Sequence, residues 1–351
     1  MTKEQLQDKC RGCLVGGAVG DALGYPVEFV YSFEEIRAKY GDDGITEYDK
    51  SYPWLEESIR HGKALFSDDT QMTLYTAEGL LEAEDSGKQI LPAIANAYIV
   101  WFGGQVGKKV KIPYDSKLSK IDELNKRRAP GNTCISALFF LNEGKEPMNA
   151  SKGCGGIMRV APVGIYGAAH GWTLEETARM AGEVAELTHL HPLSTYSSAA
   201  QAVIVQLCLL DEESIDSGRF RSVVEKSLEV VSVVYGADAP AMDEFRKLVG
   251  KALRLDDNQL CDWEFIENHL GGGWVAEETL AIAVFSVIRH IDDFNACMIC
   301  AVNHGGDSDS TGAVAGNILG AIFGYDGIPE KFTKTIQLKE LLITTADALC
   351  Q

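Results

Sequence analysis

The sequence is short of positive charge. It has 32 lysine and arginine residues against 51 aspartate and glutamate residues, a formal net charge of −19 at pH 7. General binding to nucleic acid or to an anionic membrane needs a basic surface that displaces counterions. The composition therefore disfavours both partners. An anionic ligand would have to be held by a local cluster of donors or by a metal ion.

We expect no segment that directs this chain to a membrane. The first residues, MTKEQLQDKCRGC, have no apolar stretch after the basic start. Residues 187–210 lack Asp, Glu, Lys and Arg, but their first half contains His189, His191 and Pro192. This pattern favours a polar loop followed by a buried helix over a membrane span. We expect a cytoplasmic, monomeric protein.

The cysteine pattern does not suggest a disulfide framework, because the nine cysteines are odd in number and scattered along 351 residues. Two C-x-x-C pairs are present, Cys10/Cys13 and Cys297/Cys300. Four thiolates could in principle bind zinc. Both pairs lie in small or apolar helical patterns, however, where residues i and i+3 share a buried face, so simple burial is favoured.

Helical patterns dominate the chain. Thr173 and Glu176 have the spacing of a capping box at the start of a helical segment, and the apolar segments 196–214 and 276–294 also predict helices. Strand-like runs are short; the best is 157–166 (IMRVAPVGIY), which Pro162 weakens. No βαβ alternation is visible. The predicted fold class is all-α, a compact multi-helix bundle.

Three stretches look like long loops: roughly 40–66, 103–133 and 234–273. Loops of this length in a compact domain are often functional. None of them resembles a disordered linker, so we expect one domain over residues 1–351.

Two glycine ladders step by four residues: Gly12, Gly16, Gly20 and Gly24, and Gly312, Gly316, Gly320 and Gly324. On a helix such a ladder forms a strip without side chains, along which another backbone can approach closely. Glycine in a helix costs roughly 1 kcal/mol relative to alanine. A compensating close contact is therefore expected, with both helices central in the fold.

The second ladder is preceded by the acidic segment GGDSDST, which contains Asp307, Asp309 and Ser310. An EF-hand loop starting at Asp307 would need an acid at its twelfth position, where Ile318 stands. The phosphate-loop pattern G-x-x-x-x-G-K-[ST] and the G-x-S-x-G elbow are both absent. The remaining hypothesis is that this segment forms half of a metal site.

A chemically similar segment, FSDDTQMTL, contains Ser67, Asp68 and Asp69 at the start of another predicted helix. Together the two segments would offer only oxygen ligands, which suit Mg²⁺ or Mn²⁺. Two such ions about 3.5–4 Å apart can share a bridging aspartate. The alternative is that both segments are ordinary helix N-caps, since Ser and Asp are favoured there.

A third acidic element, GDALGYPVEF, contains Asp21 and Glu28. Pro26 is expected to end the helix and leave Glu28 in a loop, where an isolated glutamate is usually exposed.

Six segments occur in an order that resembles the ADP-ribosylglycohydrolase family, which includes dinitrogenase-reductase-activating glycohydrolases and ADP-ribosylarginine and ADP-ribosylserine hydrolases. They are GGAVGDALGYPVEF, FSDDTQMTL, RRAPGNTC, SKGCGGIMRVAPVGI, LTHLHP and GGDSDSTGAVAGNILGA. Each segment is modest alone, but the ordered set covers nearly the whole chain and is highly specific.

The resemblance implies an all-α domain with a cleft that holds two Mg²⁺ or Mn²⁺ ions. One group of metal ligands would be Ser67, Asp68 and Asp69. The other would be Asp307, Asp309 and Ser310, with Asp309 as the bridge. The last position is often threonine in the family, and serine keeps the hydroxyl oxygen. Glu28 corresponds to a glutamate near the metals that gates the site or helps to activate water, so the catalytic candidates are Glu28, Asp68 and Asp69.

The resemblance also suggests how ADP-ribose is held. The glycine-rich segment with Gly153, Gly155 and Gly156 could bind phosphate through its N–H groups. Asn132 and Thr133 could line the same wall, and His189 corresponds to a histidine near the phosphates or the distal ribose. Cys154 stands where many members have asparagine. Tyr or Phe stacking on adenine is expected, without a choice of residue. A structural role is favoured for Arg159, and a structural or indirect one for His191 and His304.

The implied function is hydrolysis of the bond between ADP-ribose and a protein side chain, with arginine favoured and serine or another acceptor as the alternative. The ions would grip ribose hydroxyls and orient a water, and either Glu28 or a water at the ions would protonate the leaving group. The acids Asp115, Asp122 and Glu123 could meet a guanidinium or could be solvated charges. Rival hypotheses are a non-catalytic ADP-ribose binder and a different two-metal phosphoesterase.

Overall fold

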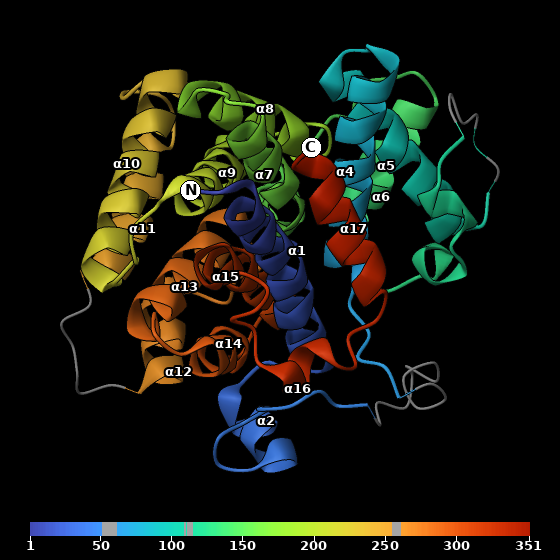
Figure 1. Ribbon diagram of the computed structural model, residues 1–351. Coiled ribbons are helices and arrows are strands. Elements are labelled where there is room, and N and C mark those ends of the chain that lie inside the picture. The colour runs from blue at the N-terminus through green and yellow to red at the C-terminus, as the bar shows by residue number, and fades with distance from the viewer. Residues whose placement is uncertain (51–61, 109, 111–114, 255–260) are drawn as a thin grey trace.

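The helix α1 (Lys3–Gly24) runs through the centre of the molecule, and α15 (Ser308–Phe323) lies directly against it (Figure 1). The structure, a computed structural model, describes residues 1–50, 62–108, 110, 115–254 and 261–351. Gly12 faces Gly320 and Gly20 faces Gly312, so the two helices are antiparallel. The prediction that both ladder helices are central and in contact is confirmed.

The contact between α1 and α15 leaves no space for side chains. A Cβ atom built at Gly312 would lie 2.5 Å from the carbonyl oxygen of Gly20, and one at Gly316 would overlap the backbone of Gly16. The side chain of Asn317 fastens the pair, because its Nδ2 donates a hydrogen bond to the carbonyl oxygen of Cys13 at 2.8 Å. The ladder therefore sets the distance between the C-terminal half of α1 and the start of α15.

The other helices pack around this central pair. The longer ones are α4 (Asp68–Ser86), α5 (Ile90–Val106), α6 (Asn132–Asn142), α7 (Ala161–Ala169), α8 (Leu174–Glu186), α9 (Pro192–Leu210), α10 (Ser217–Tyr235), α11 (Met242–Leu253), α13 (Ala276–Arg289), α14 (Phe294–Val302) and α17 (Lys339–Leu349). Shorter elements are α2 (Phe33–Tyr40), α12 (Asp262–Phe265), α16 (Glu330–Thr333), the 3₁₀ turns η1 (Tyr25–Val27), η2 (Leu118–Lys120), η3 (Asp122–Asn125) and η4 (Cys154–Arg159), and the π-helical turn η5 (Ile266–Leu270).

These helices share one core, which confirms the predicted all-α, single-domain fold class. Figure 1 shows α4, α5 and α6 on one side of α1 and α10, α11 and α13 on the other, with α17 beside α1 and α4. Every long helix contributes buried apolar side chains to one continuous cluster. In the described part of the chain, β pairing is confined to two isolated bridges, Ala64 with Ile336 and Gly153 with Val275.

The helix α9 is long and apolar enough to span a membrane by length and composition, but 89% of this segment is buried inside the protein. It packs against α7, α8 and α10 as well as α15. The predicted buried helix after a polar loop is therefore present, and it begins at Pro192 rather than at Tyr196.

One local prediction is wrong, and the one strand-like run is not a strand. Residues 157–166 form no strand; they belong to η4 and α7, and Pro162 lies in the first turn of α7, where its missing N–H costs no hydrogen bond. The expected long loop 234–273 contains α11, whose residues Met242, Phe245 and Val249 are buried along one face. The expected loop 40–66 includes residues 51–61, which lie outside the described part of the chain. The expected loop 103–133 includes residues 109 and 111–114, which also lie outside it. The described remainder of that loop, between α5 and α6, contains the short helical turns η2 and η3.

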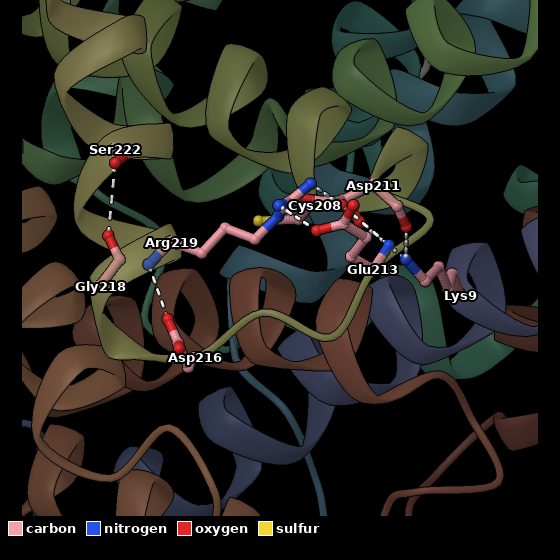
Figure 2. Close-up of polar contacts among 8 residues, drawn as sticks. All are labelled: Lys9, Cys208, Asp211, Glu213, Asp216, Gly218, Arg219 and Ser222. Carbon is pink, nitrogen blue, oxygen red and sulfur yellow. Dashed lines mark hydrogen bonds and ion pairs between the residues drawn. The ribbon is translucent and has the colours of Figure 1, made fainter.

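A network of charged groups joins α1 to the connection between α9 and α10 (Figure 2). Lys9 Nζ donates to the carbonyl oxygens of Cys208 and Asp211 at 3.0 and 2.7 Å, which satisfies acceptors at the C-terminus of α9. Arg219 Nη2 donates to the Asp211 carboxylate at 2.7 Å, and Asp216 caps α10 by accepting from the Arg219 N–H. The network therefore fixes the N-terminal part of α1, at the opposite end of this helix from Gly24.

Candidate functional site

The start of α4 is built around buried oxygen atoms. Ser67 is the N-cap, and its Oγ accepts a hydrogen bond from the backbone N–H of Asp69 at 3.2 Å. The N–H of Asp68 donates to the carbonyl oxygen of Arg128 at 3.0 Å. Arg128 is held in turn, since its Nη1 donates to the carbonyl oxygen of Phe66 at 3.0 Å. These bonds fix the carboxylates of Asp68 and Asp69 on one turn.

Asp21, in α1, holds this turn in place through hydrogen bonds to its backbone and side chains. Its Oδ1 accepts from the Ser67 N–H at 2.7 Å, and its Oδ2 accepts from the N–H and the hydroxyl of Thr70 at 2.9 and 2.6 Å. A carboxylate that accepts free N–H groups at a helix start is also favoured by the helix dipole. Asp21 therefore joins the central helix α1 to the start of α4.

The start of α15 meets the start of α4 directly. Asp307 is the N-cap of α15, and the Ser310 N–H donates to Asp309 Oδ1 at 2.9 Å. Ser310 Oγ donates to Asp69 Oδ2 at 2.8 Å, although the two residues are 241 positions apart in the sequence. The two acidic segments thus form one cluster, held in place by the close packing of α15 on α1.

Glu28 completes the cluster. It follows η1, a single 3₁₀ turn that contains Pro26, so the α-helix ends at Gly24, just before this proline, as expected. The expectation of an exposed loop glutamate is wrong, because the side chain is buried. Its Oε2 atom is buried without a hydrogen-bond partner among the described residues. A buried, unpaired carboxylate oxygen is costly unless a ligand or a cation partners it.

These groups line a cavity of about 340 Å³, a volume in the range of small-molecule sites. The lining residues are Glu28, Phe29, Asp68, Asp69, Ala129, Pro130, Gly131, Asn132, Thr133, Cys134, Gly153, Cys154, Gly155, Met158, His189, Trp274, Asp307, Asp309 and Ser310. Five of them are carboxylates, and none of the described lining residues is a lysine or an arginine. Ser67 is buried behind the wall and does not line the cavity.

Burial shifts the carboxylates of the cavity towards their protonated forms. It raises the pKa of Glu28 to about 10, with a further contribution from the negative charges of Asp307 and Asp68. The pKa values of Asp69 and Asp309 are also raised well above the usual range, first by burial and then by neighbouring carboxylates. Mutual repulsion of this kind is relieved when a cation binds. The donors are carboxylates and a hydroxyl, so the residues present fit hard divalent ions such as Mg²⁺ or Mn²⁺.

The opposite wall of the cavity carries donors for an anionic ligand. Asn132 and Thr133 are the first residues of α6, whose N-terminal N–H groups suit phosphate. Gly153 and Gly155 line the same wall. Gly156, also predicted to bind ligand, does not line the cavity; a Cβ atom there would meet the side chains of Ser194 and Ala185.

His189 is buried with one face against this glycine turn, and a Cβ atom at Gly153 would lie 3.3 Å from its Nε2. Arg159 Nη2 donates to Thr188 Oγ1 at 2.6 Å, and that oxygen lies 2.8 Å from His189 Nδ1. When the Thr188 hydroxyl donates to Nδ1, Nδ1 is the acceptor nitrogen and the neutral ring carries its single N–H at Nε2. Burial and the charge of Arg159 lower the pKa of His189 to about 3, so the imidazole is neutral.

Arg159 itself does not line the cavity. It is fully buried, with its guanidinium 4.4 Å from the ring centroid of Tyr98 and bonded to the carbonyl oxygen of Val184. His304 is also buried away from the cavity, where its Nε2 lies 2.9 Å from Thr311 Oγ1. His191 caps α9 by accepting from the Leu193 N–H. All three have the structural placement that the sequence favoured.

Cys154 stands next to the acidic cluster, and its Sγ donates to Asp307 Oδ2 at 2.8 Å. Burial and the charges of Asp307 and Asp69 raise the pKa of this thiol well above its usual range. Cys154 therefore acts here as a neutral donor that fixes one oxygen of Asp307, a role that an amide could also fill.

The structure does not bring the acids of the 103–133 segment to the cavity. Asp115 is exposed and forms an ion pair with Lys120 at 2.7 Å, and it lines a different cavity between α4 and α17. Asp122 and Glu123 lie in η3 and do not line the candidate site either. The solvated-charge interpretation is the one that their positions favour.

The mouth of the cavity contains aromatic residues that the sequence analysis did not identify. Phe29 and Trp274 are stacked with ring centroids 6.1 Å apart, and Tyr31 lies 6.4 Å from Trp274. The exposed fractions are 49%, 70% and 36% for Phe29, Tyr31 and Trp274, high values for large apolar side chains. The sequence offers no pattern that identifies them, beyond their positions in connections close to Glu28 and Gly273.

Comparison with known proteins points to one family. The profile of the ADP-ribosylglycohydrolase family matches residues 2–351. The ADP-ribosyl-[dinitrogen reductase] glycohydrolase of Rhodospirillum rubrum is 27% identical, over 97% of this chain and 94% of its own length. The ADP-ribosylhydrolase ARH3 of Mus musculus is 25% identical, over 93% and 87%. The ADP-ribosylarginine hydrolase Tri1 of Serratia proteamaculans is 24% identical, over 97% and 79%.

A solved structure described as an ADP-ribosylglycohydrolase-related protein complex has the same fold. It superimposes with a TM-score of 0.68 and covers 99% of this chain and 98% of its own. Its sequence identity is 23%, so the likeness concerns the fold alone.

Proposed function

The chain belongs to the ADP-ribosylglycohydrolase family, a family of metal-dependent hydrolases, and from this membership we propose that it releases ADP-ribose from the arginine side chain of a modified protein. The bond broken would be the N-glycosidic bond between C1″ of the ribose and a guanidinium nitrogen. One of the relatives compared above, the ADP-ribosylarginine hydrolase Tri1, has a name that specifies arginine as the modified residue. This name supports arginine over another acceptor.

The observation that carries the proposal is the joining of two distant acidic helix starts through the bond from Ser310 to Asp69. It gives five carboxylates in a cavity without a lysine or arginine among its described lining residues. The mutual repulsion of these carboxylates has no use in a protein that serves only as a scaffold. In a hydrolase the same carboxylates bind divalent cations, which relieve the repulsion.

We assign two Mg²⁺ or Mn²⁺ ions to Asp68, Asp69, Asp307, Asp309 and Ser310, with Ser67 directly behind them. Bound there, the ions supply Lewis-acid chemistry. The carboxylates left facing the ribose stabilise positive charge that develops at C1″ in an oxocarbenium-like transition state. A cationic guanidinium leaving group is attracted by the same charges.

Glu28 is assigned the proton transfer. Its unpaired Oε2 lies at the same cavity, and nearby cations would lower its pKa from about 10 towards neutrality, where a carboxyl group can either take or give a proton. Gly153, Gly155, the N-terminus of α6 and His189 Nε2–H offer donors to the diphosphate. Phe29 and Trp274 offer an aromatic surface to the adenine base.

The test is hydrolysis of a protein ADP-ribosylated on arginine and of a second one modified on serine, each with Mg²⁺ or Mn²⁺ and with EDTA, followed by mass spectrometry of the product. We expect intact ADP-ribose from the arginine substrate and none in EDTA. Turnover of the serine substrate alone would overturn the arginine assignment. AMP as product would indicate a phosphoesterase, and binding of ADP-ribose without turnover of either substrate would indicate a non-catalytic binder.

A further inference from the structure

A second group of metal-ligating side chains lies outside the cavity, where α12, α13 and α14 meet. Asp262 is the first residue of α12, His290 directly follows α13, and Cys300 lies near the end of α14. One ligand atom of each lies within 4.8 Å of the other two, and His290 Nε2 is 2.6 Å from Asp262 Oδ2. We propose that these three residues form a site for a single zinc-type divalent cation.

The donor types distinguish this site from the cavity. Asp262 offers oxygen, His290 offers an imidazole nitrogen and Cys300 offers sulfur, a mixed set that suits Zn²⁺ or Co²⁺ and not Mg²⁺. Arg289 Nε donates to Asp262 Oδ1 at 3.1 Å, which orients the carboxylate so that Oδ2 faces the histidine. Partners of this kind commonly hold the ligands of zinc sites. Binding requires the Cys300 thiol to release its proton to solvent, because the thiolate is the ligand.

The surroundings give an ion a way in and room for a fourth ligand. Cys300 is buried, whereas Asp262 and His290 are half-buried at the edge of a cavity of about 430 Å³. Asn295 lines the same cavity, and its Oδ1 is buried without a hydrogen-bond partner among the described residues. The open cavity leaves room for a water molecule as the fourth ligand of a tetrahedral shell.

An ion at this position would brace two segments that border the cavity of the candidate active site. Trp263, next to Asp262, stacks on Phe33 with ring centroids 4.8 Å apart. Glu267 Oε1, one turn further on, accepts from the N–H groups of Phe33 and Gly305 at 3.2 and 2.9 Å. Phe33 begins the helix that follows the Glu28 segment, and Gly305 precedes Asp307. The ion would therefore fix the α12–η5 unit on which both segments rest.

A simpler interpretation is an ion-pair group made of Asp262, Arg289 and His290, without metal. In that group the Cys300 thiol would remain protonated and would only donate a hydrogen bond to Asp262. Metal coordination by sulfur is therefore the property that separates the two interpretations.

The experiment is titration of the full-length, metal-stripped protein with Co²⁺ in excess Mg²⁺, with the thiolate-to-cobalt charge-transfer band in the near ultraviolet as readout. The wild type should develop this band with one equivalent of Co²⁺, and one equivalent of Zn²⁺ should abolish it. Cys300→Ser should lose the band. Two matched controls should keep it: Cys297→Ser, a buried cysteine one turn away on α14, and Cys154→Ser, the cysteine beside the acidic cavity.

Absence of the band in the wild type would overturn the proposal, as would a band that survives Cys300→Ser or disappears in Cys154→Ser. Thermal unfolding shows whether loss of the band in Cys300→Ser reflects a folding defect. In excess Mg²⁺, which fills the acidic cavity, Zn²⁺ should raise the melting temperature of the wild type and of Cys297→Ser, and should leave that of Cys300→Ser unchanged. None of these readouts involves ADP-ribose, so the outcome is independent of the proposed enzymatic function.

Discussion

At the scale of single residues, burial decides what Glu28 can do. An exposed glutamate at this position would be ionised at neutral pH and would lie in solvent. The structure instead buries it against Asp307 and Asp68, with one oxygen unpaired. The burial of Glu28 could not be predicted from the residue type, because it depends on α4 and α15, which are distant in the sequence.

The pH dependence of stability follows from this burial. In metal-free protein the folded-state pKa of Glu28, about 10, exceeds the ordinary value of 4.5, so the folded state holds a proton that the unfolded chain releases. Stability contributed by this proton is complete at low pH and is lost as pH rises from about 4.5 towards 10. The slope for one proton is at most about 1.4 kcal/mol per pH unit.

Denaturant unfolding in EDTA at several pH values measures this effect. We expect the free energy of unfolding of the wild type to fall with rising pH over this window, and the fall to be shallower in Glu28→Gln, whose amide does not titrate. Asp115→Asn, at an exposed carboxylate, is the matched control and should follow the wild type. Equal slopes for the wild type and Glu28→Gln would contradict the assignment of a buried, protonated Glu28.

At the scale of elements, the pairing of α1 with α15 is what unites the two halves of the site. Replacing Gly316 by valine would drive a side chain into the backbone of Gly16. Overpacking of this kind costs typically 1–3 kcal/mol, and more where a backbone cannot move. We expect Gly316→Val to yield little soluble protein, as would Gly16→Val.

The matched control is Gly250→Val, which also places valine at a helical glycine. A Cβ atom there meets only the flexible side chain of Arg254, at 3.5 Å. This variant should remain soluble, with a melting temperature near that of the wild type. A well-folded, active Gly316→Val protein would show that the close contact is dispensable.

Several elements could be predicted from local sequence and others could not. The capping box at Thr173 and Glu176 and the glycine ladders identified their helices, because caps and periodicity are local signals. The run 157–166 resembled a strand because α7, which contains its second half, is buried on all sides and shows no polar face. The helix α11 was missed although Met242, Phe245 and Val249 follow a helical period within a segment taken as a loop.

At the scale of the whole molecule, the fold brings the carboxylates of the candidate active site together from distant parts of the chain. The acidic residues could be named from the sequence because each segment marks a helix start. The aromatic rim of Phe29, Tyr31 and Trp274 could not, since single aromatics in loops carry no pattern. The failure of Asp115 to reach the cavity likewise depends on how η2 and η3 fold back against α4 and α5.

The central claim is that the starts of α4 and α15 form one dinuclear metal site for ADP-ribose hydrolysis. Electron paramagnetic resonance of bound Mn²⁺ tests it most directly, because two nearby ions give a spin-coupled spectrum. The wild type should bind a coupled pair. Asp68→Asn and Asp309→Asn, one from each helix start, should each abolish the coupled signal and reduce ADP-ribose release by more than about 100-fold, the upper range for removing an outer partner of a metal site. A coupled spectrum that survives either substitution, or wild-type binding of isolated ions only, would contradict the claim.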